Sequence, residues 1–234
     1  MRAMVLEVPM SVVRNLLAPA VLVSLFACSS SPGASPESDA GLDSGEPQYW
    51  GETWYPTEDV GTKTGQRIKN YKFVGFPDGD RAEGPKPVSL ADYYDPTGKT
   101  IKLIHIQAVG LWSTNCRLEM EVVGPMKPDL DARKVVWIVS VAEGLTPGMP
   151  STMDDLAKWM NNYKFKSAFP GFTAVLDPGS RNLGPFYDAA ALPWNVDIDA
   201  KTMTILSQGT GAKTTRDQIL SEIDADLAKA AQLR

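Results

Sequence analysis

The sequence predicts an α/β domain in which helices cover both faces of a central mixed β-sheet. Three observations carry this prediction. Two apolar, β-branched runs, 101–112 and 134–143, have the composition of buried central strands. Apolar side chains then recur at helical spacing, at Met153, Leu156, Ala157, Met160 and Tyr163. The chain closes with two short strands, 194–199 and 202–209, and an amphipathic helix, which indicates a hairpin packed under a terminal helix.

The segments before and between these elements complete the expected order. An aromatic lead-in, 49–61, precedes a loosely alternating strand at 67–76, which we expect to form an N-terminal β extension. A further short strand is expected at 172–180, where it runs into a turn. These strands alternate with helices, and the chain ends in a hairpin followed by a helix. About 185 residues without internal repeats are enough for one domain with a substantial core.

Helix boundaries can be read from capping and breaking residues. The glycine and two prolines at 124, 125 and 128 must kink or end the helix that begins near Cys116. Ser151 or Thr152 can cap the helix that follows. Thr215 and Gln218 have the three-residue offset of a capping box at the start of the last helix.

The first 27 residues have the pattern of a secretory signal peptide. Basic Arg2 and Arg14 precede an apolar stretch that is too short to span a bilayer. Translation could begin at Met1 or at Met10, and the second start gives the more compact signal. We therefore expect residues 1–27 to be removed.

The end of this signal resembles a bacterial lipobox. Leu25-Phe26-Ala27 leads to Cys28, which the resemblance makes the lipidated first residue, and a plain secretory signal is the alternative. A Ser/Pro/Gly/Asp-rich stretch follows at once and cannot bury enough apolar surface to fold. Residues 28–47 are thus expected to tether a domain spanning 48–234. Ser29 favours the outer membrane of a diderm bacterium, so the domain would face the periplasm or the cell exterior.

Composition excludes several classes of function. The formal net charge of −5 does not suit a nucleic-acid partner, and the single histidine excludes a multi-histidine metal site. We expect no cofactor and no metal. The chain has two cysteines, so lipidation of Cys28 would leave Cys116 as the only thiol, in a compartment that tolerates disulfides.

Four segments in order resemble the thioredoxin fold, and in particular TlpA/ResA-type thiol-disulfide oxidoreductases, which are redoxins. LWSTNCRLEM at 111–120 is similar to the family's TWCPPCRAEM, with Trp112 and Cys116 in register. ALPWNVDID resembles the segment with a cis-proline facing the active-site cysteines, which implies that Pro193 is cis. AVLDP at 174–178 and VSLADYY at 88–94 match two further segments. The likeness covers most of residues 61 to 232.

The first cysteine of the family's C-x-x-C motif is Ser113 here. A serine hydroxyl forms no disulfide, so dithiol exchange within this chain is excluded. Three readings of Cys116 stay open. In the first, Ser113, Cys116 and Glu119 match the peroxiredoxin pattern [T/S]-x-x-C-x-x-E, although Val109 replaces its proline and Pro193 stands where its arginine is usual. Cys116 would then reduce peroxide as a thiolate stabilised by the helix N-terminus, and an external thiol would regenerate it.

In the second reading, Cys116 forms mixed disulfides with a partner protein's thiol or disulfide. In the third, the domain has lost its chemistry and binds a partner in the old groove, lined by Trp112, Pro193, Trp194 and Glu119. The sequence favours single-thiol chemistry no more strongly than it favours binding.

Other polar residues have plainer interpretations. His105 lies mid-strand and is expected to be a packed or hydrogen-bonded core histidine. Asp197 and Asp199 share one strand face and are expected to be solvated near a turn. For Glu119, a surface or capping role and proton transfer both stay open. Trp137 and Trp159 are expected in the core.

Overall fold

A computed structural model describes residues 54–162, 164–169, 171–188 and 190–233. The predicted signal peptide, Cys28, the linker and the first residues of the domain lie outside these described residues. Within the described part of the chain, no helix is both long and apolar enough to cross a membrane.

One seven-stranded mixed sheet forms the centre of the domain, with the strand order β2-β1-β5-β4-β3-β6-β7. The strands are β1 Lys72–Phe76, β2 Lys86–Ser89, β3 Leu103–Gly110, β4 Val135–Glu143, β5 Thr173–Leu176, β6 Trp194–Asp199 and β7 Ile205–Thr210. β3, β4 and β5 pair in parallel, whereas the β1–β2, β1–β5, β3–β6 and β6–β7 pairs are antiparallel. The predicted central strands and closing hairpin are confirmed.

The helices begin and end at the residues that the sequence marks. They are α1 Thr114–Val123, α2 Lys127–Ala132, α3 Met153–Met160 and α4 Arg216–Gln232. Gly124 and Pro125 end α1 in a 3₁₀ turn before α2. Thr152 caps α3 in a full capping box with Asp155. Thr215 caps α4, but Gln218 accepts from the backbone of Thr214 rather than from Thr215, so the predicted reciprocal box is incomplete.

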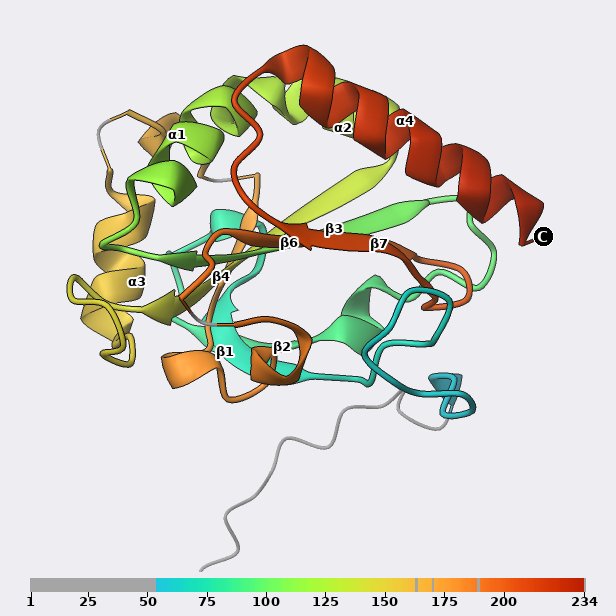
Figure 1. Ribbon diagram of the computed structural model, residues 1–234, viewed down its shortest axis with the longest axis horizontal. Helices are drawn as coiled ribbons and strands as arrows, with labels where there is room; N and C mark the ends of the chain where they lie inside the picture. The colour runs from blue at the N-terminus through green and yellow to red at the C-terminus, as the bar shows by residue number, and fades with distance from the viewer. Residues whose placement is uncertain (1–53, 163, 170, 189, 234) are drawn as a thin grey trace, which may run out of the picture. The chain divides into compact units, whose positions relative to one another are not determined.

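Figure 1 shows α1, α2 and α4 together on one side of the sheet, while 3₁₀ helices at 90–93 and 184–186 lie on the other. The two faces of β6 differ accordingly. Trp194, on one face, packs against Phe186 and Tyr187, with ring centroids 5.2 and 5.0 Å away. Asn195, on the other, contacts Glu119 of α1. This alternation is the normal consequence of strand geometry, but the helix-facing side is unusually polar.

The first described residues pack near the start of β3. Trp54 stacks on Tyr94 with ring centroids 5.0 Å apart. The next residue, Asp95, donates its backbone N–H to Ala200, which in turn donates to Lys102, just before β3. The aromatic lead-in is thus packed against the end of the sheet where β3 begins.

Candidate functional site

The N-terminus of α1 and the loop before β6 meet at Ser113. Ser113 is the N-cap of α1, and its Oγ accepts a long hydrogen bond, 3.3 Å, from the backbone N–H of Cys116. The same hydroxyl donates to the carbonyl of Leu192 at 3.4 Å. The peptide bond that follows, Leu192–Pro193, is cis. Ser113 is therefore a neighbour of both Cys116 and the cis peptide bond, as the resemblance to the redoxin segments implies.

Cys116 is a free thiol with no exposed surface. Burial raises its pKa to about 11, while hydrogen bonds from Ser113 and the backbone of Gly110 act in the opposite direction. The charge of Glu119 raises the pKa further, and that of Arg117 lowers it. We expected the helix N-terminus to stabilise a thiolate. A thiolate is not favoured in this conformation, because the cost of burying a charge outweighs the hydrogen bonds to the sulfur.

Trp112 is held in place by a buried carboxylate. Its indole N–H donates to Glu143 Oε2 at 2.5 Å, and Glu143, at the end of β4, is 4% exposed. Gly110 lets the indole lie this close, since a Cβ at that position would be 2.7 Å from Trp112 Nε1. Trp112 is half-buried, so part of the ring faces solvent.

The other predicted groove residues do not line an open surface. Pro193 is buried, Trp194 is 1% exposed and Glu119 is 0% exposed. Trp194 points to the face of the sheet away from α1 and stacks on Tyr187. A wide aromatic groove, which the binding interpretation needs, is therefore absent among these four residues in this conformation.

Glu119 is instead the centre of a buried hydrogen-bond network. Its oxygens accept from Gln107 Nε2 at 2.8 Å, from Asn195 Nδ2 at 3.2 Å and from the backbone N–H of Lys213 at 3.2 Å. The surface or capping role considered for Glu119 is thus wrong. No basic side chain is among these partners, so neutral donors alone hold the carboxylate one helical turn from Cys116.

The network continues to the only histidine. His105 Nδ1 lies 2.8 Å from Asp197 Oδ1, and its Nε2 lies 3.1 Å from Asn195 Oδ1. The imidazole stacks on Trp137, with centroids 3.6 Å apart. The prediction of a hydrogen-bonded core histidine is confirmed.

The prediction that Asp197 and Asp199 are solvated is wrong, because they are 3% and 0% exposed. Burial alone would raise the pKa of Asp197, but the charge of His105 and hydrogen bonds from His105 and Asp226 lower it. Asp199 accepts from the backbone and hydroxyl of Thr202 and so closes the hairpin turn. The alternating aspartates of this strand face the polar layer under α1 and α4 rather than water.

Three residues of the site were not identified from the sequence. Glu143 ends an apolar strand, and Tyr187 lies in an irregular segment, so neither has a motif around it. The hydroxyl of Tyr187 forms a hydrogen bond with Ser180 Oγ at 3.0 Å. Burial is the main cause of the raised pKa of Tyr187, and the charge of Cys116 also contributes to it. Asn195 lies between Trp194 and Val196, where a polar residue in a central strand is the one available signal. Trp137 and Trp159 are in the core as predicted.

Metal binding has no support from side-chain geometry. Within residues 54–162, 164–169, 171–188 and 190–233, no three histidine, cysteine or acidic side chains group in a way that could hold an ion.

Comparison with known proteins establishes the fold of this chain but assigns it to no family. No protein-family model and no curated protein matches the sequence. Among solved structures, AhpC of Enterococcus faecalis is similar at a TM-score of 0.53 and 12% identity, over 73% of this chain and 96% of that one. A Chlorobium tepidum protein assigned as thiol:disulfide interchange protein DsbE gives 0.51 and 16%, over 71% and 99%. The fold is thioredoxin-like.

A third similar structure is the reduced 2-Cys peroxiredoxin of Plasmodium vivax, with a TM-score of 0.50 and 16% identity over 70% of this chain and 82% of that one. At such identities the likeness establishes the architecture only. What the site of this thioredoxin-like domain does has to be argued from its own residues.

The raised pKa of Cys116 predicts a distinctive pH profile. In a C28S variant, where Cys116 is the only thiol, the alkylation rate of the folded protein is expected to rise about tenfold per pH unit up to pH ~10 without levelling off. In urea the rate should level off above pH ~8.5, the ordinary value for cysteine. Adding S113A to this variant should slow the alkylation of the folded protein, because the change removes a hydrogen bond that lowers the pKa of Cys116. In urea it should leave the alkylation rate unchanged. A folded-state midpoint near pH ~8.5 would contradict the assignment.

Proposed function

We propose that this chain is a thiol-dependent oxidoreductase that works through Cys116 as a single thiol and takes small hydroperoxides as its oxidant. One observation carries the proposal. The hydroxyl of Ser113 joins the backbone N–H of Cys116 to the carbonyl that precedes cis Pro193. Both bonds are long, at 3.4 and 3.3 Å, so the hydroxyl can exchange them for hydrogen bonds to a peroxide oxygen at the sulfur. On this proposal the chain is a TlpA-like redoxin with serine in place of the first active-site cysteine.

Burial of the sulfur supports a small hydroperoxide over a protein disulfide as the oxidant. Attack on a protein disulfide requires a second chain's sulfur to align with Cys116, and neither Cys116 nor Ser113 has more than 3% of its surface exposed. A hydroperoxide is only a few atoms in size and needs a much smaller opening. Peroxide reduction is therefore favoured over mixed-disulfide exchange. Because the thiol is protonated at neutral pH, the reaction should be slow.

The proposed reaction balances with one external reductant. The sulfur of Cys116 forms an S–O bond as the O–O bond of the hydroperoxide breaks, and the thiol proton goes to the leaving oxygen. The products are a sulfenic acid and water, or an alcohol. Two equivalents of an external thiol then return Cys116 to the thiol, releasing water and a disulfide. Within the described residues there is no second cysteine to resolve the sulfenic acid.

The test is treatment of the folded protein with hydrogen peroxide in the presence of a sulfenic-acid trap, followed by intact mass measurement. We expect one trapped adduct on Cys116 at modest peroxide excess, no adduct in C116S, and slower formation in S113A, which lacks the hydroxyl. S221A, which removes an exposed hydroxyl on α4, is the matched control and should react like the parent protein. An adduct that forms only after unfolding would rule the proposal out.

A second candidate is a domain without redox chemistry; the burial and raised pKa of Cys116 support the lack of chemistry, although the four predicted groove residues leave no open groove for a partner. Such a domain should give no trapped adduct when folded, and C116A should keep its stability and any partner binding. The same experiment therefore separates the two candidates.

We further propose that the domain is anchored outside the cytoplasm by a lipid on Cys28, with the outer membrane favoured. The sequence pattern at 25–28 and the low-complexity stretch after it support this. Expressed in a diderm bacterium, the protein should fractionate with membranes and carry an acylated N-terminal cysteine by mass spectrometry. C28A should be found in soluble fractions or keep its signal peptide. Equal fractionation of both forms would refute the anchor.

A further inference from the structure

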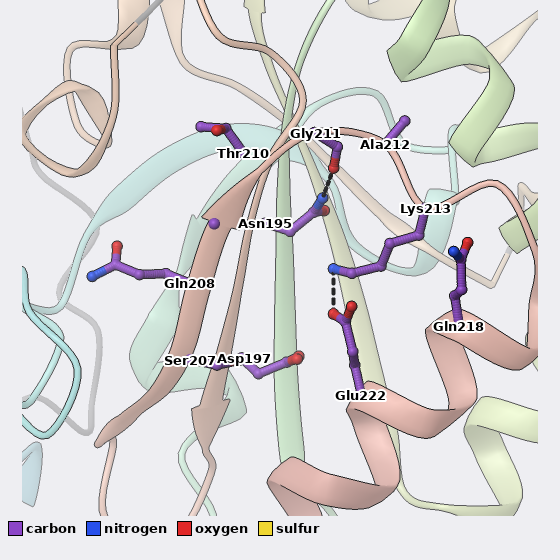
Figure 2. A pocket seen from close by; sticks show the side chains of 11 residues that line it. Asn195, Asp197, Ser207, Gln208, Thr210, Gly211, Ala212, Lys213, Gln218 and Glu222 are labelled. Carbon is purple, nitrogen blue, oxygen red and sulfur yellow. Dashed lines mark hydrogen bonds and ion pairs between the residues drawn. The ribbon is translucent and has the colours of Figure 1, made fainter.

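A polar pocket of about 420 Å³ opens beside the helix-facing side of β6, away from Ser113. Its walls are β6, the end of β7, the glycine-rich segment 209–213 and the first turns of α4 (Figure 2). The volume lies within the usual range for small-molecule sites, about 300–1,000 Å³.

Charged groups of both signs converge in this pocket from three elements. Lys213 Nζ lies 2.8 Å from Glu222 Oε2, and the lysine side chain is only 18% exposed although it lies in a loop. Figure 2 shows Asn195, Lys213, Glu222 and Asp197 directed into the same space. Asp197, at the base, is buried and fixed by His105.

This arrangement discriminates among ligand charges. A simple anion would meet Lys213 but also the carboxylates of Glu222 and Asp197, which repel it. A simple cation would pair with Glu222 in place of Lys213. The ammonium of Lys213, whose side chain is 18% exposed, would then lose its ion-pair partner, which costs binding free energy. A ligand with both charges avoids each penalty, because its carboxylate can pair with Lys213 while its ammonium pairs with Glu222.

We propose that the pocket binds a small zwitterion with a primary ammonium and a carboxylate close together, the class to which free amino acids belong. The Lys213–Glu222 ion pair is then the ligand-free state of the site, in which the two charges satisfy each other. Asn195, whose amide is bonded to His105, Glu119 and Gly211, forms part of the wall, and Asp197 supplies a fixed negative charge at the base. This site does not depend on any reaction at Cys116.

The test is calorimetric titration of the folded protein with L-alanine and L-glutamine, and with two fragments of alanine, propionate and ethylamine. We expect saturable binding of at least one amino acid and none of either fragment over the same concentration range. K213M and E222Q should each weaken binding about tenfold or more, as loss of one charge-assisted contact predicts. E222Q keeps an oxygen that can accept from Lys213, and K213M keeps the aliphatic stem of the side chain, so both variants should fold, which urea unfolding can check.

K158M provides the matched control, because Lys158 also forms an ion pair, with Asp154 on α3, but lies outside the pocket. It should bind amino acids like the parent protein. The proposal is overturned if neither amino acid binds, if propionate or ethylamine binds as tightly, or if K158M weakens binding as much as K213M does.

Discussion

Replacing Gly75 with alanine is expected to lower the free energy of unfolding by about 3 kcal/mol. Gly75 lies in β1 between β2 and β5, opposite Lys86 and Val175. A Cβ at this position would lie 2.2 Å from the carbonyl oxygen of Ala174 and 2.7 Å from Val175 Cα. Both contacts are with the backbone of a neighbouring strand, which cannot move without breaking the β1–β5 pairing. Urea unfolding followed by tryptophan fluorescence measures the loss.

Gly209 offers a matched control for this substitution. It also lies in a strand, β7, and a Cβ there would meet no atom within 4 Å. G209A should therefore change the free energy of unfolding by less than about 0.5 kcal/mol. Equal stability of G75A and G209A would mean that β1 and β5 do not approach each other as described.

The second large effect is expected at Asp197. D197N should lower the free energy of unfolding by about 2–3 kcal/mol at pH 7, because it removes the charge that the buried His105 and Asp226 hold in place. The pKa of Asp197 is lowered in the folded protein. Its ionised form therefore stabilises the fold above the unfolded pKa of about 4, and this stabilisation is lost as the pH falls. The difference between D197N and the parent protein should shrink below pH ~4.

D154N removes an exposed carboxylate from a surface ion pair and should cost less than about 1 kcal/mol at any pH. A double-mutant cycle of D197N with H105N should give a coupling energy of about 2 kcal/mol. If D197N and D154N lose equal stability, or if the loss at Asp197 does not vary with pH, the buried pair does not have the assigned role.

Much of the fold could be predicted because apolar patterning and breakers act locally. The runs that became β3 and β4 are buried along almost their whole length, and the proline and glycine positions end α1 as expected. That Ser113, Cys116 and Pro193 lie near one another could also be predicted, but only from the resemblance of four segments, in order, to the redoxins.

The electrostatic character of the site could not be predicted in the same way. The sequence shows a cysteine at a helix N-terminus, which suggests a stabilised thiolate, but burial depends on how distant segments pack over it. Glu119 and Asp197 show the same difficulty. From sequence alone, a lone carboxylate is expected to face solvent. Only the tertiary arrangement shows that Glu119 and Asp197 form hydrogen bonds with side chains on other strands, more than 70 residues away in the sequence.

The contact of Trp54 with Tyr94 has a geometric consequence for access. Trp54 and Tyr94 pack near the start of β3, whereas Ser113 and Cys116 follow its other end. The eight residues of the strand place these two ends about 23 Å apart. The aromatic lead-in therefore does not cover the approach to the thiol.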